Sequence, residues 1–242
     1  MARRRFFVDR IQGDRAELTG DDARHVARVL RAEVGQQYEL SDNNRAFLAE
    51  ITEAGAQCVK FRIVEPLAPD PPSPVITIFA ALIKFDRFEW LVEKATELGA
   101  ARIVPVDADR TEEGLARAAT KRVDRWKKIA RESSQQARRL RIPEIAAPAT
   151  FDAVVSESAA ARFFLDEQPD ADPLLRVLPP GRIPTDAIAI LTGPEGGWTD
   201  RERALATSAG WKPVSLGRQI LRAETASIAA IAILGHAWQI LP

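Results

Sequence analysis

The 242-residue sequence has very few of the residues that build disulfides and metal sites: one cysteine, Cys58, and two histidines, His25 and His236. A single cysteine excludes a disulfide within the chain, and two histidines without a cysteine cluster form no metal-ligand motif. No stretch approaches the roughly 20 consecutive apolar residues that a membrane-spanning helix needs. We therefore expect no metal ion and no membrane partner.

The N-terminal residues lack the features of a secretion signal. Arg3, Arg4 and Arg5 are followed only by the short apolar run Phe6-Phe7-Val8, whereas a signal peptide carries about 7–15 apolar residues at this place. We therefore expect the protein to be cytoplasmic.

The chain also lacks net charge, because 34 lysines and arginines are balanced by 34 aspartates and glutamates. This balance argues against a protein that coats nucleic acid indiscriminately. The charge is unevenly distributed, however: the stretch from Arg110 to Arg141 holds eleven basic residues against four acidic ones. Such a stretch is typical of a protein that meets a polyanion on one face. The alternative is a solvated helix face.

A cluster of prolines marks a domain boundary. Five prolines fall between Pro66 and Pro74 with little apolar sequence among them, which is typical of a stiff linker. Before this linker, Thr19-x-x-Asp22 resembles the capping box of a helix, and three short runs have strand character, namely 37–40, 46–51 and 58–64. We predict a small β-rich domain over residues 1–68, a compact barrel.

The sequence after the linker alternates strand-like and helix-like segments. The pattern predicts strands at 75–82, 102–106, 162–165, 187–191 and 214–216, and helices at 88–98, 123–139 and 225–240. Gly99 is placed to end the first of these helices, and Thr199-x-x-Glu202 to begin another. The alternation predicts an α/β domain with a mostly parallel sheet over residues 74–242.

Two glycine-bearing turns are the most informative feature. Leu191–Gly197 reads LTGPEGG and Leu216–Ala226 reads LGRQILRAETA, and each lies between an apolar run and a helix-like segment. Ligands bind at the ends of such strands in open α/β sheets. Neither the G-x-G-x-x-G pattern nor a Walker A loop is present, so the turns indicate a small-molecule pocket of another kind. For the first turn alone, the alternative is a β–α turn that needs glycine only to change direction.

The second turn favours a flat aromatic ligand. Ile220 and Leu221 offer apolar side chains and free backbone groups in a non-helical stretch, which is what an adenine ring requires. Arg222 and Glu224 add opposite charges nearby, and Thr225 is a candidate cap for the last helix.

These motifs resemble the RsmE family of the SPOUT superfamily, which are S-adenosylmethionine-dependent methyltransferases. GPEGG and LGxxILRxETA carry the resemblance, and further blocks in the right order extend it over nearly the whole chain: Arg5-Phe6-Phe7, His25–Arg31, Lys84-x-x-Arg87, Glu93–Gly99 and Arg125–Gln136. One position departs from the pattern, because Gln219 stands where the family usually carries arginine.

The resemblance implies an α/β fold: a C-terminal SPOUT domain over 74–242 with a trefoil knot, and an N-terminal PUA-like β-barrel over 1–68 that helps hold RNA. It implies methylation of N3 of a specific uridine in 16S ribosomal RNA of the small subunit by a homodimer. The implied S-adenosylmethionine site comprises Leu165, Leu191, Thr192, Gly193, Pro194, Glu195, Gly196, Gly197, Leu216, Gly217, Ile220, Leu221, Arg222 and Thr225.

Methyl transfer to a uracil nitrogen requires alignment with the sulfonium methyl and an acceptor for the N3 proton. We expect Arg222 to stabilise the developing uracil anion and Glu195 or Glu224 to accept the proton. The alternative is a structural salt bridge between Arg222 and Glu224. Phosphate contacts, which need charge rather than precise geometry, are expected from Arg3, Arg4, Arg5, Arg31, Lys84, Arg87, Arg125, Arg138 and Arg139.

Two other functions fit the same motifs. One is another SPOUT activity, such as ribose 2′-O methylation, which has a different requirement for a proton acceptor. The other is a non-catalytic RNA-binding relative. The intact GPEGG and ETA turns argue against the non-catalytic reading, whereas Gln219 keeps it open.

Overall fold

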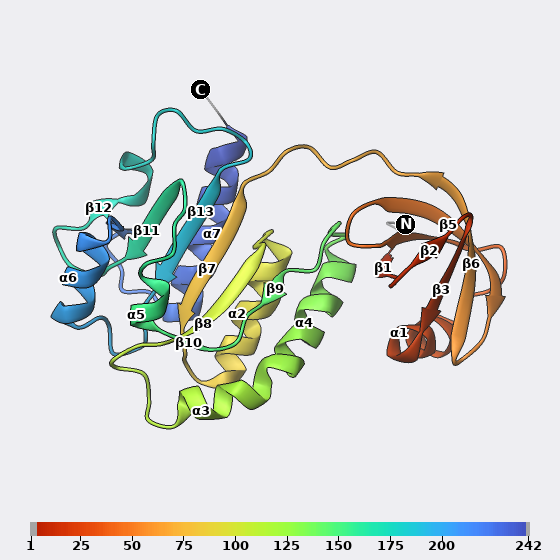
Figure 1. Ribbon diagram of the computed structural model, residues 1–242, viewed down its shortest axis with the longest axis horizontal. Coiled ribbons are helices and arrows are strands. Elements are labelled where there is room, and N and C mark those ends of the chain that lie inside the picture. The colour runs from red at the N-terminus through yellow and green to blue at the C-terminus, as the bar shows by residue number, and fades with distance from the viewer. Residues whose placement is uncertain (1–3, 241–242) are drawn as a thin grey trace. The chain divides into compact units, whose positions relative to one another are not determined.

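The computed structural model describes residues 4–240, which fall into two compact units (Figure 1). Residues up to Pro71 and Arg131–Ile142 form the N-terminal unit, and Pro72–Ala130 with the residues from Pro143 onward form the C-terminal unit. The sequence placed Arg131–Ile142 in the second domain. These residues group with the first because Asp22 accepts hydrogen bonds from Arg131 Nε and Gln135 Nε2, both at 2.9 Å.

The N-terminal unit is built on a six-stranded mixed sheet in the order β1-β4-β5-β6-β3-β2. β1 and β4 pair in parallel, and the other neighbours pair antiparallel. The three strands expected from the sequence are confirmed, each slightly longer than predicted. The bounds are β1 Arg5–Phe7, β2 Ile11–Gln12, β3 Arg15–Thr19, β4 Gln37–Ser41, β5 Ala46–Ala54 and β6 Cys58–Pro66.

A short helix α1 (Gly20–Arg24) and a π-helical turn over His25–Val29 link β3 to β4. The capping box predicted at Thr19 is wrong: Thr19 is the N-cap residue of α1, but its side chain makes no capping hydrogen bond. The carboxylate of Asp22 is used instead by the two donors from the segment Arg131–Ile142. Beneath the sheet lies an apolar core that includes Phe6, Leu40 and Phe61.

The C-terminal unit holds an eight-stranded sheet in which all the pairings are parallel. The order is β10-β8-β7-β13-β11-β14-β12, and β9 pairs with β8. The central strands are apolar on both faces, as expected for a sheet covered on both sides. The bounds are β7 Val75–Ala81, β8 Arg102–Asp107, β9 Glu144–Ile145, β10 Ala149–Thr150, β11 Ala161–Leu165, β12 Asp172–Pro173, β13 Ala187–Thr192 and β14 Lys212–Ser215.

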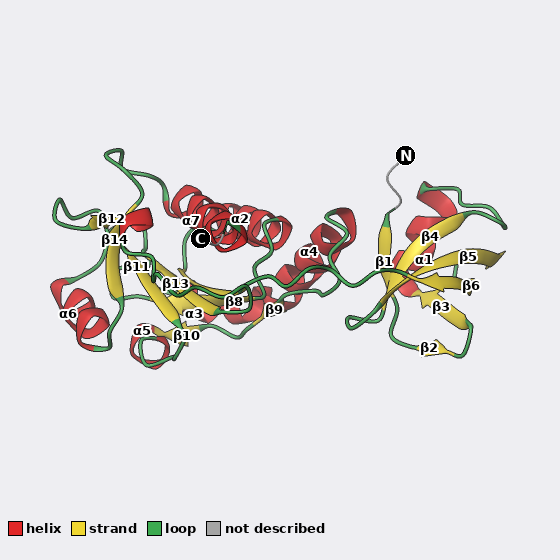
Figure 2. Ribbon diagram, turned by 90° about the horizontal axis from the view of Figure 1, so that it is seen from above, coloured by secondary structure: helices red, strands yellow, loops and turns green. Residues whose placement is uncertain are grey.

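Helices cover both faces of this sheet. The bounds are α2 Phe85–Glu97, α3 Leu115–Ala119, α5 Phe151–Val154, α6 Asp200–Ser208 and α7 Ala223–Gln239. α4 (Val123–Gln136) begins in this unit, and its residues from Arg131 onward belong to the N-terminal unit. α2 and α7 pack together on one face, whereas α5 and α6 lie on the other (Figure 2). The predicted helix end at Gly99 is confirmed by its φ of 97°. Across residues 4–240, no helix is long and apolar enough to cross a membrane.

The core of the C-terminal unit determines where a ligand can lie. Buried side chains from β7, β11 and β13 pack against Trp198 and Trp211. Because neighbouring parallel strands end at the same edge of the sheet, β11, β13 and β14 bring their carboxyl ends together there. Ligand sites of open α/β sheets lie at this edge.

Candidate active site

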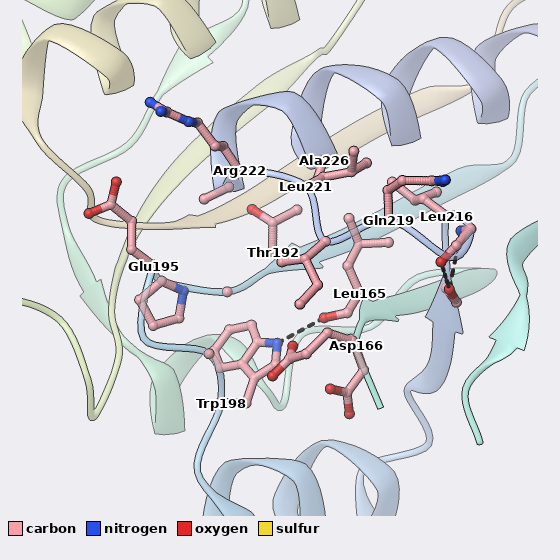
Figure 3. A pocket seen from close by; sticks show the side chains of 18 of the residues that line it. Leu165, Asp166, Thr192, Glu195, Trp198, Leu216, Gln219, Leu221, Arg222 and Ala226 are labelled. Atoms are coloured by element: carbon pink, nitrogen blue, oxygen red, sulfur yellow. Dashed lines mark hydrogen bonds between the residues drawn. The ribbon is translucent and has the colours of Figure 1, made fainter. Parts of the chain in front are cut away.

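A cavity of about 570 Å³ lies at the carboxyl ends of β11, β13 and β14. Its walls are the segments that follow these three strands (Figure 3). Arg87 from α2 completes the lining. The lining residues are Arg87, Leu165, Asp166, Glu167, Thr192, Gly193, Pro194, Glu195, Gly196, Gly197, Trp198, Val214, Ser215, Leu216, Gly217, Arg218, Gln219, Ile220, Leu221, Arg222, Ala223 and Ala226. The two turns singled out in the sequence therefore meet in one cavity.

Trp198 ties the loop after β13 to the end of β11. Its indole is fully buried and stacks on Phe164 with ring centroids 4.8 Å apart. The indole Nε1 donates a hydrogen bond to the Leu165 carbonyl at 2.9 Å (Figure 3). Gly193 lies directly against this ring, because an added Cβ would stand 3.0 Å from Cε2 and Nε1. Gly193, the first glycine of GPEGG, thus allows the two cavity walls to pack closely against each other.

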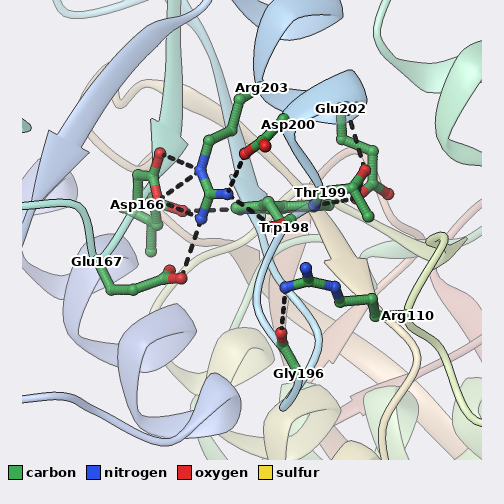
Figure 4. A network of polar contacts seen from close by, with 10 residues as sticks. Arg110, Asp166, Glu167, Gly196, Trp198, Thr199, Asp200, Glu202 and Arg203 are labelled. Atoms are coloured by element: carbon green, nitrogen blue, oxygen red, sulfur yellow. Dashed lines mark hydrogen bonds and ion pairs between the residues drawn. The ribbon is translucent and has the colours of Figure 1, made fainter.

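Arg203 of α6 holds the same two loops together through its charge (Figure 4). Its guanidinium donates to both carboxylate oxygens of Asp166, to Glu167 Oε1 at 3.0 Å and to the Trp198 carbonyl at 2.7 Å. The side chain of Asp166 is only 4% exposed, so this bidentate pairing compensates its desolvation. The hydrogen bonds that Arg203 donates to Asp166 raise the pKa of the Arg203 guanidinium.

The start of α6 fixes the end of the GPEGG loop. Thr199 and Glu202 form the predicted capping box: Glu202 N donates to Thr199 Oγ1, and Thr199 N donates to Glu202 Oε2 at 2.8 Å. Asp109, after β8, accepts from Thr199 Oγ1 and from Arg201, whose hydrogen bond lowers the pKa of the Asp109 carboxyl. Arg110 donates to the Gly196 carbonyl at 2.9 Å (Figure 4).

The third wall is the stretch between β14 and α7, which is not helical, as predicted. Gly217 adopts a φ of 133°, a conformation that other residues rarely adopt. Ile220 and Leu221 present apolar side chains, and Ile220 is 87% exposed. An isoleucine this exposed at the rim of a cavity is available to contact a ligand or a partner.

Most of the predicted cofactor-site residues line the cavity, but two do not. Leu191 is fully buried within β13. Thr225 is exposed in the first turn of α7, and Arg222 rather than Thr225 is the N-cap residue of that helix. Asp166, Glu167 and Trp198 also line the cavity, although the motifs did not predict them. Their place directly after a predicted strand end or beside the GPEGG turn is the signal that could have found them.

The three predicted catalytic residues lie in different environments. Arg222 and Glu195 line the cavity and lie at one end of it in the view of Figure 3. Glu195 forms an ion pair with Arg87, which was expected to contact phosphate. Glu224 is buried, does not line the cavity and has a carboxylate oxygen without a hydrogen-bond partner. Among the described residues no ion pair joins Arg222 to Glu224, so the structural salt bridge considered above does not form.

The residues predicted to contact phosphate are distributed over both units. Arg5 is buried in an ion pair with Glu39, which Arg138 also joins, so Arg5 serves the interior of the N-terminal unit. Arg125 pairs with Glu89. Burial lowers the pKa of Arg139 to about 10.

The remaining predicted phosphate contacts are exposed or half-buried. Arg31 and Lys84 are exposed, and Arg4 Nη1 lies 2.6 Å from His25 Nε2. Arg3 lies outside the described residues. Among residues 4–240 no cluster of three or more histidine, cysteine, aspartate or glutamate side chains could hold a metal ion.

Comparison with known proteins identifies the family. A model of an RNA methyltransferase domain matches residues 70–235, and a model of an RNA methyltransferase PUA domain matches residues 18–64. Ribosomal RNA small subunit methyltransferase E of Synechocystis is 33% identical over 89% of this chain and 71% of the relative. The protein of the same name from Mycobacterium bovis is 31% identical over 95% of this chain and 90% of the relative. The chain belongs to this methyltransferase family.

Solved structures of similar proteins share the whole fold. A methyltransferase from Legionella pneumophila, solved with bound cofactor SAM, is 31% identical, covers 98% of each chain and has a TM-score of 0.87. Ribosomal RNA small subunit methyltransferase E from Neisseria gonorrhoeae, solved with S-adenosyl methionine, is 28% identical with a TM-score of 0.84. The family resemblance inferred from the motifs is therefore confirmed, as is the N-terminal PUA domain.

Proposed function

We propose that the protein transfers the methyl group of S-adenosylmethionine to N3 of a uridine in 16S ribosomal RNA of the small subunit. The observation that carries the proposal is the meeting of the GPEGG and LGRQILRAETA turns in one cavity of about 570 Å³. Family membership supports the chemistry, because relatives named for ribosomal RNA methylation are similar over most of this chain.

The cavity has the chemistry that S-adenosylmethionine requires. Leu165, Leu216 and Leu221 offer apolar walls for the adenine ring, and the loop backbone offers polar groups beside them. Asp166 and Glu167 together carry one more negative charge than the Arg203 guanidinium with which both pair, and this surplus favours a ligand that carries a sulfonium and an ammonium group. When bound, the cofactor supplies a methyl group on a positively charged sulfur.

Arg222 and Glu195 are the residues that we propose act on the uracil. N3 must lose its proton before or as it takes the methyl group, so the site must stabilise the uracil anion that develops and accept that proton, while the S–CH3 bond breaks and leaves a neutral thioether. Arg222 lies at the rim of the cavity and carries the positive charge for the first task. Of the two carboxylates proposed for the second, Glu195 lines the cavity whereas Glu224 does not, and we therefore assign the role to Glu195. Good orientation of two reacting groups can supply about 7–11 kcal/mol of barrier reduction, so holding N3 in line with the methyl group is a main task of the site.

We further propose a knotted C-terminal region and a homodimer. After β14 the chain runs through residues 216–222 and returns to pack α7 against β7, β13 and α2, a crossing of the kind that a trefoil knot requires. The exposed Ile220 and Leu221 supply apolar surface at the cavity rim for a second protomer.

The two units take separate roles in this proposal. The N-terminal unit, which contains the PUA domain, helps hold the RNA, and the C-terminal unit carries the methyltransferase. The proposed phosphate contacts are Arg4, Arg31, Lys84 and Arg139. Replacing each by a neutral residue is expected to weaken RNA binding additively and to reduce the dependence of that binding on salt concentration. The substrate, a ribosomal subunit, places the protein in the cytoplasm.

Two measurements test the function. Calorimetric titration with S-adenosylmethionine is expected to show selective binding, whereas ATP and NAD are expected not to bind. Incubation with the cofactor and small ribosomal subunits that lack the modification should then yield 3-methyluridine in nucleosides analysed by mass spectrometry. The appearance of 2′-O-methyluridine would assign the other reaction, and cofactor binding without any methylated nucleoside would refute the enzymatic proposal.

Variants of the cavity test the assigned roles. Arg222→Ala and Glu195→Gln are expected to lower turnover while leaving the fold intact. Arg176→Ala is the matched control, because Arg176 is an exposed arginine outside the cavity lining. Unchanged turnover in a folded Arg222→Ala variant would eliminate its catalytic role.

A further inference from the structure

A buried pair of hydroxyl groups lies under the candidate cofactor site. Thr192, the last residue of β13, is 1% exposed and belongs to the lining of the cavity (Figure 3). Ser227 of α7 is fully buried. The Ser227 Oγ lies 3.0 Å from Thr192 Oγ1 and 2.8 Å from the carbonyl oxygen of Ala223.

The number of protons determines the direction of both hydrogen bonds. A serine hydroxyl has one proton to donate, and a carbonyl oxygen can only accept. Without a proton between them, Ser227 Oγ and the Ala223 carbonyl would be two facing acceptors at 2.8 Å. Ser227 must therefore donate to Ala223, and Thr192 must donate its own proton to Ser227. The Thr192 oxygen is left with lone pairs only.

We infer that Thr192 is a specificity-determining residue that accepts a hydrogen bond from an N–H group of the bound cofactor. The inference rests on the proposed function. Ser227 is a positioning residue, because it holds the Thr192 proton away from the ligand. Because its own proton is already donated to Ser227, the Thr192 oxygen can accept a hydrogen bond from the ligand but cannot donate one. It therefore favours a ligand N–H. A carbonyl oxygen at the same place is disfavoured, since two facing acceptors leave a buried polar group unpaired.

Two amino groups of S-adenosylmethionine carry such N–H donors, the 6-amino group of adenine and the α-ammonium of the methionine part. Three ligands distinguish them. S-adenosylhomocysteine has both groups, S-inosylhomocysteine has a carbonyl in place of the 6-amino group, and 5′-methylthioadenosine lacks the ammonium. The test is calorimetric titration of the full-length protein with each ligand, for the wild type, Thr192→Val, Thr192→Ser and Ser227→Ala.

Thr192→Val removes the acceptor with little change in shape. We expect it to weaken the binding of S-adenosylhomocysteine by about tenfold, the effect of one hydrogen bond. If the partner is the ammonium, the affinity for 5′-methylthioadenosine should stay unchanged; if it is the 6-amino group, the affinity for S-inosylhomocysteine should rise, because its carbonyl then no longer faces the Thr192 acceptor. Thr192→Ser keeps the hydroxyl and should therefore show the wild-type preference for S-adenosylhomocysteine over the analogue that lacks the partner N–H. Ser227→Ala should lower the preference although Thr192 is intact, because the Thr192 proton can then turn toward the ligand.

A change in preference against S-inosylhomocysteine identifies the adenine amino group, and a change against 5′-methylthioadenosine identifies the ammonium; either result supports the inference. Wild-type preferences in both Thr192→Val and Ser227→Ala would overturn it. So would an equal weakening of all three ligands together with a lowered melting temperature, since that result indicates a purely structural pair. Failure of the wild type to bind any of the three would count against the proposed function instead.

Discussion

Replacing Gly193 by alanine is expected to destabilise the protein through a clash with Trp198. The new Cβ would lie 3.0 Å from Cε2 and Nε1 of the indole and 3.4 Å from Cδ2. The ring cannot retreat freely, because it is fully buried, stacked on Phe164 and hydrogen-bonded to the Leu165 carbonyl. Gly193 is not among the residues with positive φ, so the cost arises from packing rather than from backbone strain.

The expected loss in unfolding free energy follows from two opposing effects. Overpacking a well-filled core costs about 1–3 kcal/mol, and replacing glycine by alanine recovers about 0.4–1 kcal/mol by restricting the unfolded chain. A net loss of about 1–2 kcal/mol corresponds to a fall in melting temperature of about 2–8 °C for a chain of this length. Thermal unfolding followed by circular dichroism measures this shift.

Two further variants test whether contact with the Trp198 indole causes the expected loss of stability. Gly181→Ala is the matched control, because no atom lies within 4 Å of its added Cβ, and its melting temperature should stay the same or rise. Trp198→Phe replaces the indole by a smaller ring that lacks Nε1, so Gly193→Ala should cost less in that background than in the wild type. If Gly193→Ala melts at the same temperature as Gly181→Ala, the close approach of Gly193 to the indole does not constrain the fold.

Three other variants test the polar contacts around the site and in the N-terminal unit. Arg203→Ala should lower the unfolding free energy by about 3–5 kcal/mol in denaturant titration, because it leaves the buried Asp166 carboxylate unpaired; Asp166→Asn should cost less. Asp109→Asn should destabilise near pH 7, because the hydrogen bond from Arg201 holds the Asp109 pKa below its usual 3.8 and the ionised carboxylate stabilises the fold above that pH. The deficit should shrink only as the pH falls below 3.8 and through the lowered pKa of the folded state; a deficit that stays constant over that fall contradicts this. Asp22→Ala should cost about 1–3 kcal/mol by releasing its two donors on α4, and unchanged proteolysis of the N-terminal unit would speak against that role.

The sequence predicted correctly those features that depend only on residues close together in the chain. The Thr199–Glu202 capping box formed because its bonds join residues three positions apart. Gly99 ended its helix for a similar reason, since only its own backbone angle matters. The apolar β-branched runs at β7 and β13 were recognisable because a strand buried on both faces needs no polar alternation.

The capping box predicted at Thr19 did not form, because side chains remote in the sequence bind the carboxylate that it would have needed. Thr19 and Asp22 have the spacing of a capping box, but the Asp22 carboxylate accepts from Arg131 and Gln135, more than 100 positions away. The same contacts place Arg131–Ile142 with the N-terminal unit, although helical spacing in the sequence runs through this segment without a break. A local sequence motif does not predict which donor from a remote part of the chain will hydrogen-bond to a carboxylate.

The sequence by itself determined the two turns that build the cavity and, through them, the family of the protein. The tertiary structure decided which side chains face that cavity. Asp166 and Trp198 line it, whereas Leu191 and Glu224 are buried beside it. The physical reason is that parallel strands far apart in sequence meet at one edge of the sheet, and their packing alone determines which residues of each turn are left to face a ligand.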